Sequence, residues 1–225
     1  MKRSIRPITV VPFGLAFFLG IATTASPALA QKAEAPILVT SCGQSPGPLR
    51  LTVFMKRLQI AHDLKEDATV KDLSAKPYKT LVVVTGSSLK GMGAAGVSIE
   101  DEVKRVTALI AEATKKGITV VGSHVEGMER RAKNAAPGDN SDEISIDAVC
   151  PKSKFMIVRK DGDEDGRFTA LSNKHNIPVV FFNKNAEIQD VLKTVFGPPS
   201  LPEPNEATAR LRRDAGVSGA AQASQ

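Results

Sequence analysis

Side chains capable of chemistry gather in a few short stretches of the 225-residue chain. Glycine amides, hydroxyl groups and basic side chains are the groups that hold a small anion. We therefore identify as candidate ligand-binding residues Gly43, Gln44, Ser45, Ser87, Ser88, Lys90, Gly91, Gly93, Gly96, His124, Glu126, Arg130 and Arg131. A small anionic molecule is the partner that this set predicts.

Cys42 and His124 are the candidate catalytic residues. A thiol at the start of a helix has its thiolate favoured, and an imidazole within hydrogen-bond reach could act as its base. The alternative is that Cys42 ends a buried strand as a small apolar residue. Two residues do not make an active site, so a thiol-dependent hydrolase or transferase remains an alternative hypothesis.

The stretch Gly91-Met92-Gly93-Ala94-Ala95-Gly96 spells the glycine pattern of dinucleotide-binding proteins. That pattern works where its first glycine turns directly from a strand into a helix, with an acidic residue about 20 positions further on. Here residues 87–90 intervene, and Glu126 lies too far along the chain. A mobile glycine loop and a loose anion cradle are the two interpretations left open, and no cofactor is assigned.

The acidic stretch 161–166 reproduces the first half of a calcium-binding loop. Its twelfth position is Ser172, where a calcium loop requires a bidentate glutamate. We expect these acids to form a solvated turn and to favour the start of the next helix through its dipole. Cys42, His124 and Glu126 lack the close spacing of a metal site, so no metal is predicted.

Strand and helix patterns alternate along the body of the chain, which predicts an α/β fold. Continuous apolar runs predict strands, and apolar residues at helical spacing predict the helices between them. The expected strands are 37–41, 81–85, 118–125, 155–158 and 177–182, with a possible short one at 61–64. Such runs belong to parallel sheets covered on both faces. We predict a doubly wound, Rossmann-like three-layer sandwich with a five- or six-stranded, mainly parallel sheet.

Ligands of such sheets bind in the crevice at the carboxyl ends of the strands. The loops that start at Cys42, Gly86, His124 and Lys160 all lie on that edge of the predicted sheet. Cys150 precedes a strand and belongs to the opposite edge. Because a disulfide tolerates a Cα separation of only about 7 Å, we predict no Cys42–Cys150 bond.

The first 30 residues have the pattern of a cleavable signal peptide. Three basic residues precede a short apolar run, and Ala28-Leu29-Ala30 fits the cleavage rule. We therefore divide the chain into a signal peptide (1–30), one α/β domain (31–197) and a flexible tail rich in proline and alanine (198–225). A periplasmic or secreted location follows, with no membrane insertion after cleavage.

The composition, with 42% apolar and 24% charged residues, suits an ordinary globular domain. Half of the formal net charge of +6 lies in the first 30 residues, so the body is too weakly basic to predict nucleic-acid binding.

Three strings carry a resemblance to a known family: 40–47 (TSCGQSPG), 82–96 (VVVTGSSLKGMGAAG) and 117–127 (GITVVGSHVEG), the last followed by Arg130-Arg131. The chain resembles a family of small exported bacterial α/β proteins known only as a domain of unknown function, over roughly 37–197. This resemblance implies a fold and no activity. Our leading hypothesis is a periplasmic protein that binds a small anionic ligand, and a partner-docking accessory protein of the envelope is a further alternative.

Overall fold

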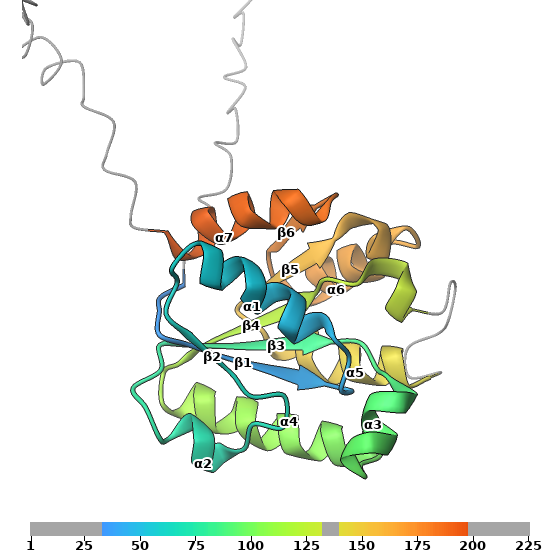
Figure 1. Cartoon of the computed structure of the whole chain (residues 1–225). Helices are drawn as coiled ribbons and strands as arrows, with labels where there is room; N and C mark the ends of the chain where they lie inside the picture. Colours follow the sequence, from blue (N-terminus) through green and yellow to red (C-terminus); the bar gives the residue numbers. More distant parts are fainter. Residues whose placement is uncertain (1–32, 132–139, 198–225) are drawn as a thin grey trace, which may run out of the picture.

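Six parallel strands form the centre of the computed structural model, which describes residues 33–131 and 140–197 (Figure 1). The strands are β1 (Ile37–Cys42), β2 (His62–Leu64), β3 (Thr80–Thr85), β4 (Thr119–His124), β5 (Phe155–Arg159) and β6 (Val179–Phe182). Their order across the sheet is β2-β1-β3-β4-β5-β6. The predicted parallel α/β sandwich is thereby confirmed, and residues 62–64 supply the sixth strand at one edge of the sheet.

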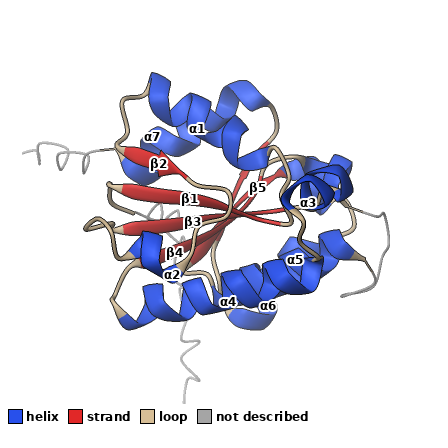
Figure 2. Ribbon diagram, turned by 60° about the horizontal axis from the view of Figure 1, so that its bottom comes forward, coloured by secondary structure: helices blue, strands red, loops and turns tan. Residues whose placement is uncertain are grey.

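The described residues form seven α-helices, and six of them cover the two faces of this sheet (Figure 2). The seven helices are α1 (Gly47–Arg57), α2 (Val70–Leu73), α3 (Leu89–Ala95), α4 (Ile99–Lys115), α5 (Ser141–Val149), α6 (Arg167–His175) and α7 (Ile188–Phe196). Four short 3-10 helices are η1 (Gly127–Arg130), η2 (Cys150–Lys152), η3 (Lys160–Asp163) and η4 (Asn185–Glu187). Helices α1 and α7 pack on one face, and α2, α4, α5 and α6 pack on the other.

The two faces of the sheet are buried because alternate strand residues point in opposite directions. In β3, Val82 and Val84 join the core beneath α1 and α7, whereas Leu81 and Val83 join the core beneath α4. A strand buried on both sides reads as a continuous apolar run, which is why the sequence predicts these strands.

Helix α4 shows how the sequence sets the limits of a helix. The Ser98 hydroxyl accepts a hydrogen bond from the Asp101 N–H, and the Asp101 carboxylate accepts one in return from the Ser98 N–H. This reciprocal cap satisfies donors that the first turn leaves free. Apolar residues recur at helical spacing from Ile99 to Ala113, and those at Val106, Ile110 and Ala113 are buried against the sheet.

The glycine-rich stretch 86–97 differs from expectation, because it contains helix α3 instead of a continuous loop. The Ser88 hydroxyl caps this helix by accepting from the Gly91 N–H. Gly96 ends the helix in the left-handed conformation, with a φ of 67°.

The order of the strands has a switch point between β1 and β3, where the chain stops adding strands toward one edge of the sheet and starts adding them toward the other. From β1 the chain passes through α1 to β2 on one side, and from β3 it passes through α4 to β4 on the other. Helices α1 and α4 cover opposite faces, so the loops that follow β1 and β3 diverge from adjacent strand ends. Parallel sheets bind ligands at such a position.

Among the described residues, no helix combines the length and apolar composition needed to cross a membrane.

Candidate functional site

Loops from three neighbouring strands meet at the carboxyl edge of the sheet. Gln44, after β1, forms an isolated bridge with Ser87, after β3. The Ser88 N–H donates to the Gly43 carbonyl at 2.7 Å, and Arg130 Nη1, after β4, donates to the Ser87 carbonyl at 2.9 Å. These segments, far apart in sequence, therefore share one rim, which we call the switch-point rim (residues 43–50, 86–91 and 126–130).

Two glycines make the close approach of these loops possible. Gly43 has a φ of 108°, and a Cβ there would lie 2.7 Å from the Cα of Ser87. A Cβ on Gly91 would collide with the main-chain oxygen of Gln44. Any side chain at either position would separate loops that are in direct contact.

The glycine amides do not form the bare cradle that the sequence suggests. The Gly43 N–H donates to Glu102 Oε2 at 2.9 Å, and the Gly91 N–H donates to Ser88 Oγ at 3.0 Å. Gly93 and Gly96 are exposed, and a Cβ on either would meet nothing within 4 Å. Lys90 is exposed as well. The amides of Gly43 and Gly91 are therefore already bonded within the protein and are not free to hold a ligand.

Arg50 and Arg130 supply the positive charge at the rim. Both guanidinium groups approach the buried carboxylate of Glu126, which follows β4. The distance to Glu126 Oε1 is 3.8 Å from Arg50 Nη2 and 3.5 Å from Arg130 Nε. Arg50 also lies 3.7 Å from Glu129 Oε2. These contacts are too long for strong hydrogen bonds, so much of the donor capacity of the two guanidinium groups is not used by residues 33–131 and 140–197.

The three rim serines belong to local hydrogen-bond networks. Ser45 Oγ accepts from the Gly47 N–H at 3.3 Å, at the start of α1. Ser87 Oγ lies 2.5 Å from Ser141 Oγ and 3.0 Å from an oxygen of Asp142, and the Ser87 N–H donates to that oxygen at 2.6 Å. Ser88 caps α3. The start of α5 is thus fastened to the end of β3.

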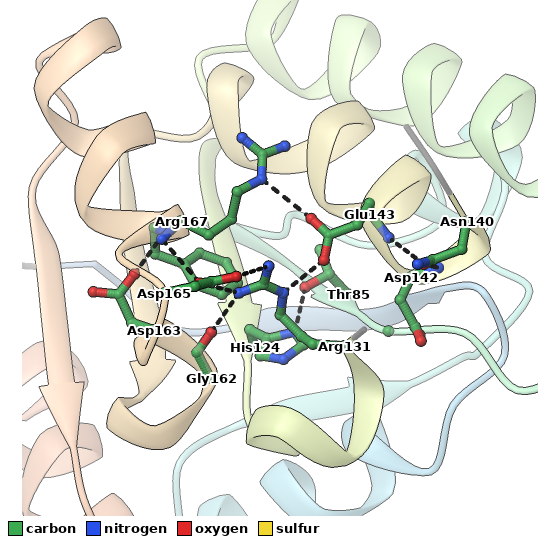
Figure 3. A network of polar contacts seen from close by, with 12 residues as sticks. Thr85, His124, Arg131, Asn140, Asp142, Glu143, Gly162, Asp163, Asp165 and Arg167 are labelled. Carbon is green, nitrogen blue, oxygen red and sulfur yellow. Dashed lines mark hydrogen bonds and ion pairs between the residues drawn. The ribbon is translucent and has the colours of Figure 1, made fainter. Parts of the chain in front are cut away.

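Arg131 is a correction, because it faces the protein interior and does not reach the rim (Figure 3). Its side chain is fully buried. The guanidinium donates to Glu143 Oε1 at 2.6 Å, to the Gly162 carbonyl at 2.7 Å and to both Asp165 oxygens at 2.8 Å. A fully buried cation with this many internal partners holds loops together and is not accessible to a ligand from solvent.

His124 is the second correction. It is fully buried, its Nε2 donates to the Gly127 carbonyl at 2.9 Å, and its Nδ1 lies 3.1 Å from Thr85 Oγ1 (Figure 3). Burial lowers its pKa, which keeps the ring neutral. With both ring nitrogens bonded inside the protein, His124 is not placed to act as a general base or to contact a ligand.

Cys42 does not form a catalytic pair with His124. Cys42 pairs with Thr85 in the sheet, and Thr85 in turn contacts His124, so one strand separates the two candidates. Burial, followed by the nearby Glu102 charge, raises the pKa of the Cys42 thiol to about 12. The alternative of a small buried residue at the end of a strand is the one that fits. Cys42 and Cys150 are both buried free thiols.

The acidic stretch 161–166 is occupied by internal partners. Asp163 accepts from the Phe168 and Thr169 N–H groups at the start of α6. Asp165 binds Arg131, and Asp161 binds Arg159, and these hydrogen bonds lower the pKa values of both carboxyl groups. Within the described chain, no group of three or more His, Cys, Asp or Glu side chains is arranged to hold a metal ion.

Comparison with known proteins identifies a family. The family described as "Domain of unknown function (DUF6305)" matches residues 34–196, which is most of the chain. The chain belongs to this family. A search of curated proteins returns no significant match to the DUF6305 chain.

Two solved esterase structures are weakly similar to the DUF6305 chain. A mutant of the esterase AlinE4 is 14% identical, and the alignment covers 86% of this chain and 98% of the esterase, with a TM-score of 0.28. The esterase EstA from Pseudoalteromonas sp. is 11% identical, covering 69% and 93%, with a TM-score of 0.29. TM-scores this low carry no argument about the activity of this chain.

The sequence interpretation missed Arg50, which lies at the rim, and Asp142, which binds the rim residue Ser87. Arg50 lies in the first turn of α1, which begins at Gly47, and the prolines at positions 46 and 48 are a usable sequence signal of a helix start. Asp142 lies at the start of α5, 55 residues from the Ser87 amide that it binds. No local pattern connects two positions so far apart.

Two cavities of the DUF6305 chain lie away from the rim. One, of about 340 Å³, lies at the amino-terminal edge of the sheet and includes Lys152, Ser153 and Lys154. The other, of about 620 Å³, is an apolar groove along α4 that includes Val103, Ala111 and Ile144. Neither contains a candidate site residue.

Proposed function

We propose that this protein binds a small anionic ligand at the switch-point rim, between Arg50 and Arg130. The observation that carries the proposal is that two guanidinium groups approach one carboxylate without forming a close ion pair with it. A planar guanidinium matches the geometry of a carboxylate or phosphate group, and its spare N–H groups can bind such a group directly.

The exposure of the two cations supports this role. The Arg50 side chain is 41% exposed and the Arg130 side chain is 29% exposed. Both can therefore contact a molecule from solvent while their stems stay anchored. The neighbouring Arg131 has the same charge but is fully buried. Position on the rim, and not residue type, distinguishes the ligand-binding cations.

The position of the pair in the fold supports the proposal independently. Arg50 belongs to the helix that follows β1, and Arg130 binds Ser87 in the loop that follows β3. From these two adjacent strands the chain continues toward opposite edges of the sheet. Parallel sheets bind ligands at such a switch point.

Titration calorimetry against acetate, succinate, inorganic phosphate and glycerol phosphate tests the proposal. We expect at least one of these anions to bind, and we expect Arg50→Gln and Arg130→Gln each to weaken binding about tenfold, since a hydrogen bond to a charged group contributes about 1.5–3 kcal/mol. The control is Lys154→Gln, which removes an exposed cation at the opposite edge. Absence of binding at millimolar concentrations, or equal binding by both rim variants and wild type, would overturn the proposal.

Export to the periplasm or the medium is part of the proposal and is supported by the pattern of residues 1–30. N-terminal sequencing of protein recovered from the envelope of its host tests it. A mature chain that begins at Gln31 is expected, and an unprocessed chain found only in the cytosol would contradict export.

A further inference from the structure

Glu126 has a buried carboxylate oxygen that the protein leaves without a partner. The residue is fully buried, and its Oε2 makes no hydrogen bond within the described chain. A buried charged group that lacks a partner is costly, and nearly all such groups in folded proteins are satisfied. An orphan carboxylate oxygen next to a candidate binding site therefore indicates a donor supplied from outside the protein, and because Oε2 is buried, the rim side chains that cover it must move for such a donor to reach it.

The two oxygens of Glu126 face different surroundings. Oε1 faces Arg50 and Arg130 at the rim. Oε2 faces the first turn of α1, where a Cβ on Gly47 would stand 3.1 Å from it. A single carboxylate thus has one oxygen beside the proposed anion-binding cations and the other directed at a helix start.

That helix start has few donors to offer. Pro46 and Pro48 have no N–H group, and the Gly47 N–H donates to Ser45 Oγ. The first turn of most helices presents free N–H groups to a nearby carboxylate. The Pro-Gly-Pro sequence here removes most of them, which explains why Oε2 stays unpaired.

We propose that the ligand carries a hydrogen-bond donor, a hydroxyl or an ammonium group, close to its anionic group, and that this donor binds Glu126 Oε2. The inference rests on the proposed function and specifies its ligand class. The anionic group would lie on Arg50 and Arg130, beside Oε1. Since Oε1 and Oε2 belong to one carboxylate, the donor must be within a few bonds of the anion, as in a 2-hydroxy acid or an amino acid.

Charge balance makes this arrangement selective. An acid without a donor would bring its own carboxylate close to Glu126 and would compete for the same guanidinium groups, which is unfavourable. A ligand that donates to Oε2 satisfies the orphan oxygen and offsets that repulsion. The site would therefore discriminate between acids of the same size by the presence of one donor.

Titration calorimetry with matched acids tests the inference on the purified protein. The sets are propionate, lactate and alanine, and succinate, malate and aspartate. We expect at least one donor-bearing acid to bind about tenfold or more tightly than the plain acid of its set. Comparison of lactate with alanine, and of malate with aspartate, shows whether the donor is a hydroxyl or an ammonium group.

The variant Glu126→Gln removes the charge and keeps the shape of the side chain. We expect it to weaken binding of the donor-bearing acid and to leave the plain acid unchanged or tighter, so that the preference is lost. The matched control is Glu129→Gln, which changes a 60%-exposed carboxylate that also approaches Arg50. This control should keep the preference.

The outcomes separate the two proposals. If no acid of either set binds, this inference is overturned, and if acetate and the two phosphate compounds do not bind either, the proposed function fails with it. If plain and donor-bearing acids bind equally to the wild-type protein, the inference is overturned and the proposed function stands. That comparison needs no variant, so it decides the matter even if Glu126→Gln fails to fold.

Discussion

Gln44 and Ser87 form an antiparallel bridge although the strands that they follow, β1 and β3, run parallel. The chain can reverse here because Gly43 and Gln44 adopt positive φ angles of 108° and 57°. The bridge fastens the loop before α1 to the loop before α3. The rim is therefore a pre-formed part of the fold and does not need a ligand to assemble it.

Gly91→Ala should test how tightly these loops are joined. Its Cβ would collide with the main-chain oxygen of Gln44, whereas a Cβ on Gly93, in the same helix, would meet nothing within 4 Å. We expect Gly91→Ala to lower the free energy of unfolding by about 1–3 kcal/mol. Gly93→Ala should raise it by up to about 1 kcal/mol, because alanine favours a helix more than glycine does. Urea unfolding measures both, and equal effects would contradict the close contact.

The Arg131→Met variant should have a much lower free energy of unfolding than the Arg130→Met variant. Arg131 is buried between Glu143 and Asp165, so within the described chain its removal leaves Asp165 without its cation and leaves Glu143 with Arg167 alone. Breaking a buried ion pair in this way costs about 3–5 kcal/mol. The Arg130 side chain is partly exposed and Arg50 remains beside Glu126, so the loss of Arg130 and of its bond to the Ser87 carbonyl should cost less, about 1–2 kcal/mol. Similar urea midpoints for the two variants would show that the buried network does not stabilise the fold.

The strands and helices were predictable because burial leaves a local pattern. Val82, Val83 and Val84 read as a strand buried on both faces, and the stripe from Ile99 to Ala113 reads as one face of a helix. These patterns repeat within a few residues, so neighbouring positions suffice to detect them. The family resemblance is confirmed over residues 34–196, whereas the predicted signal peptide and tail lie outside the described residues.

The site was only partly predictable because its decisive contacts are not local. Arg130 and Arg131 are adjacent and identical in type, and only the positions of Glu143 and Asp165, far along the chain, make one of them structural. The glycine pattern led to a wrong prediction of free amides for a related reason. Capping by Ser88 turns that stretch into a helix and uses an amide that appeared free.

His124 should make the stability of the protein depend on pH. Burial lowers the pKa of His124 in the folded state, whereas an unfolded histidine titrates near pH 6.5. The unfolded state therefore takes up a proton first as the pH falls, so the His124 contribution is complete above about pH 6.5 and is lost below it. The variant His124→Gln should show a weaker fall in urea midpoint between about pH 6.5 and pH 5. The control His175→Gln, at an exposed position, should keep the slope of the wild type.

Cys42 should react slowly with iodoacetamide in the folded protein. Its thiol is fully buried and burial raises its pKa to about 12, so almost no thiolate is present at neutral pH. Mass spectrometry of the peptide that contains Cys42 should show little labelling in native buffer and rapid labelling in denaturing urea. The denatured sample is the control for reagent and peptide recovery. Rapid labelling of the native protein near pH 7 would mean that Cys42 is accessible as a thiolate, and it would restore the thiol-dependent enzyme as a competing hypothesis.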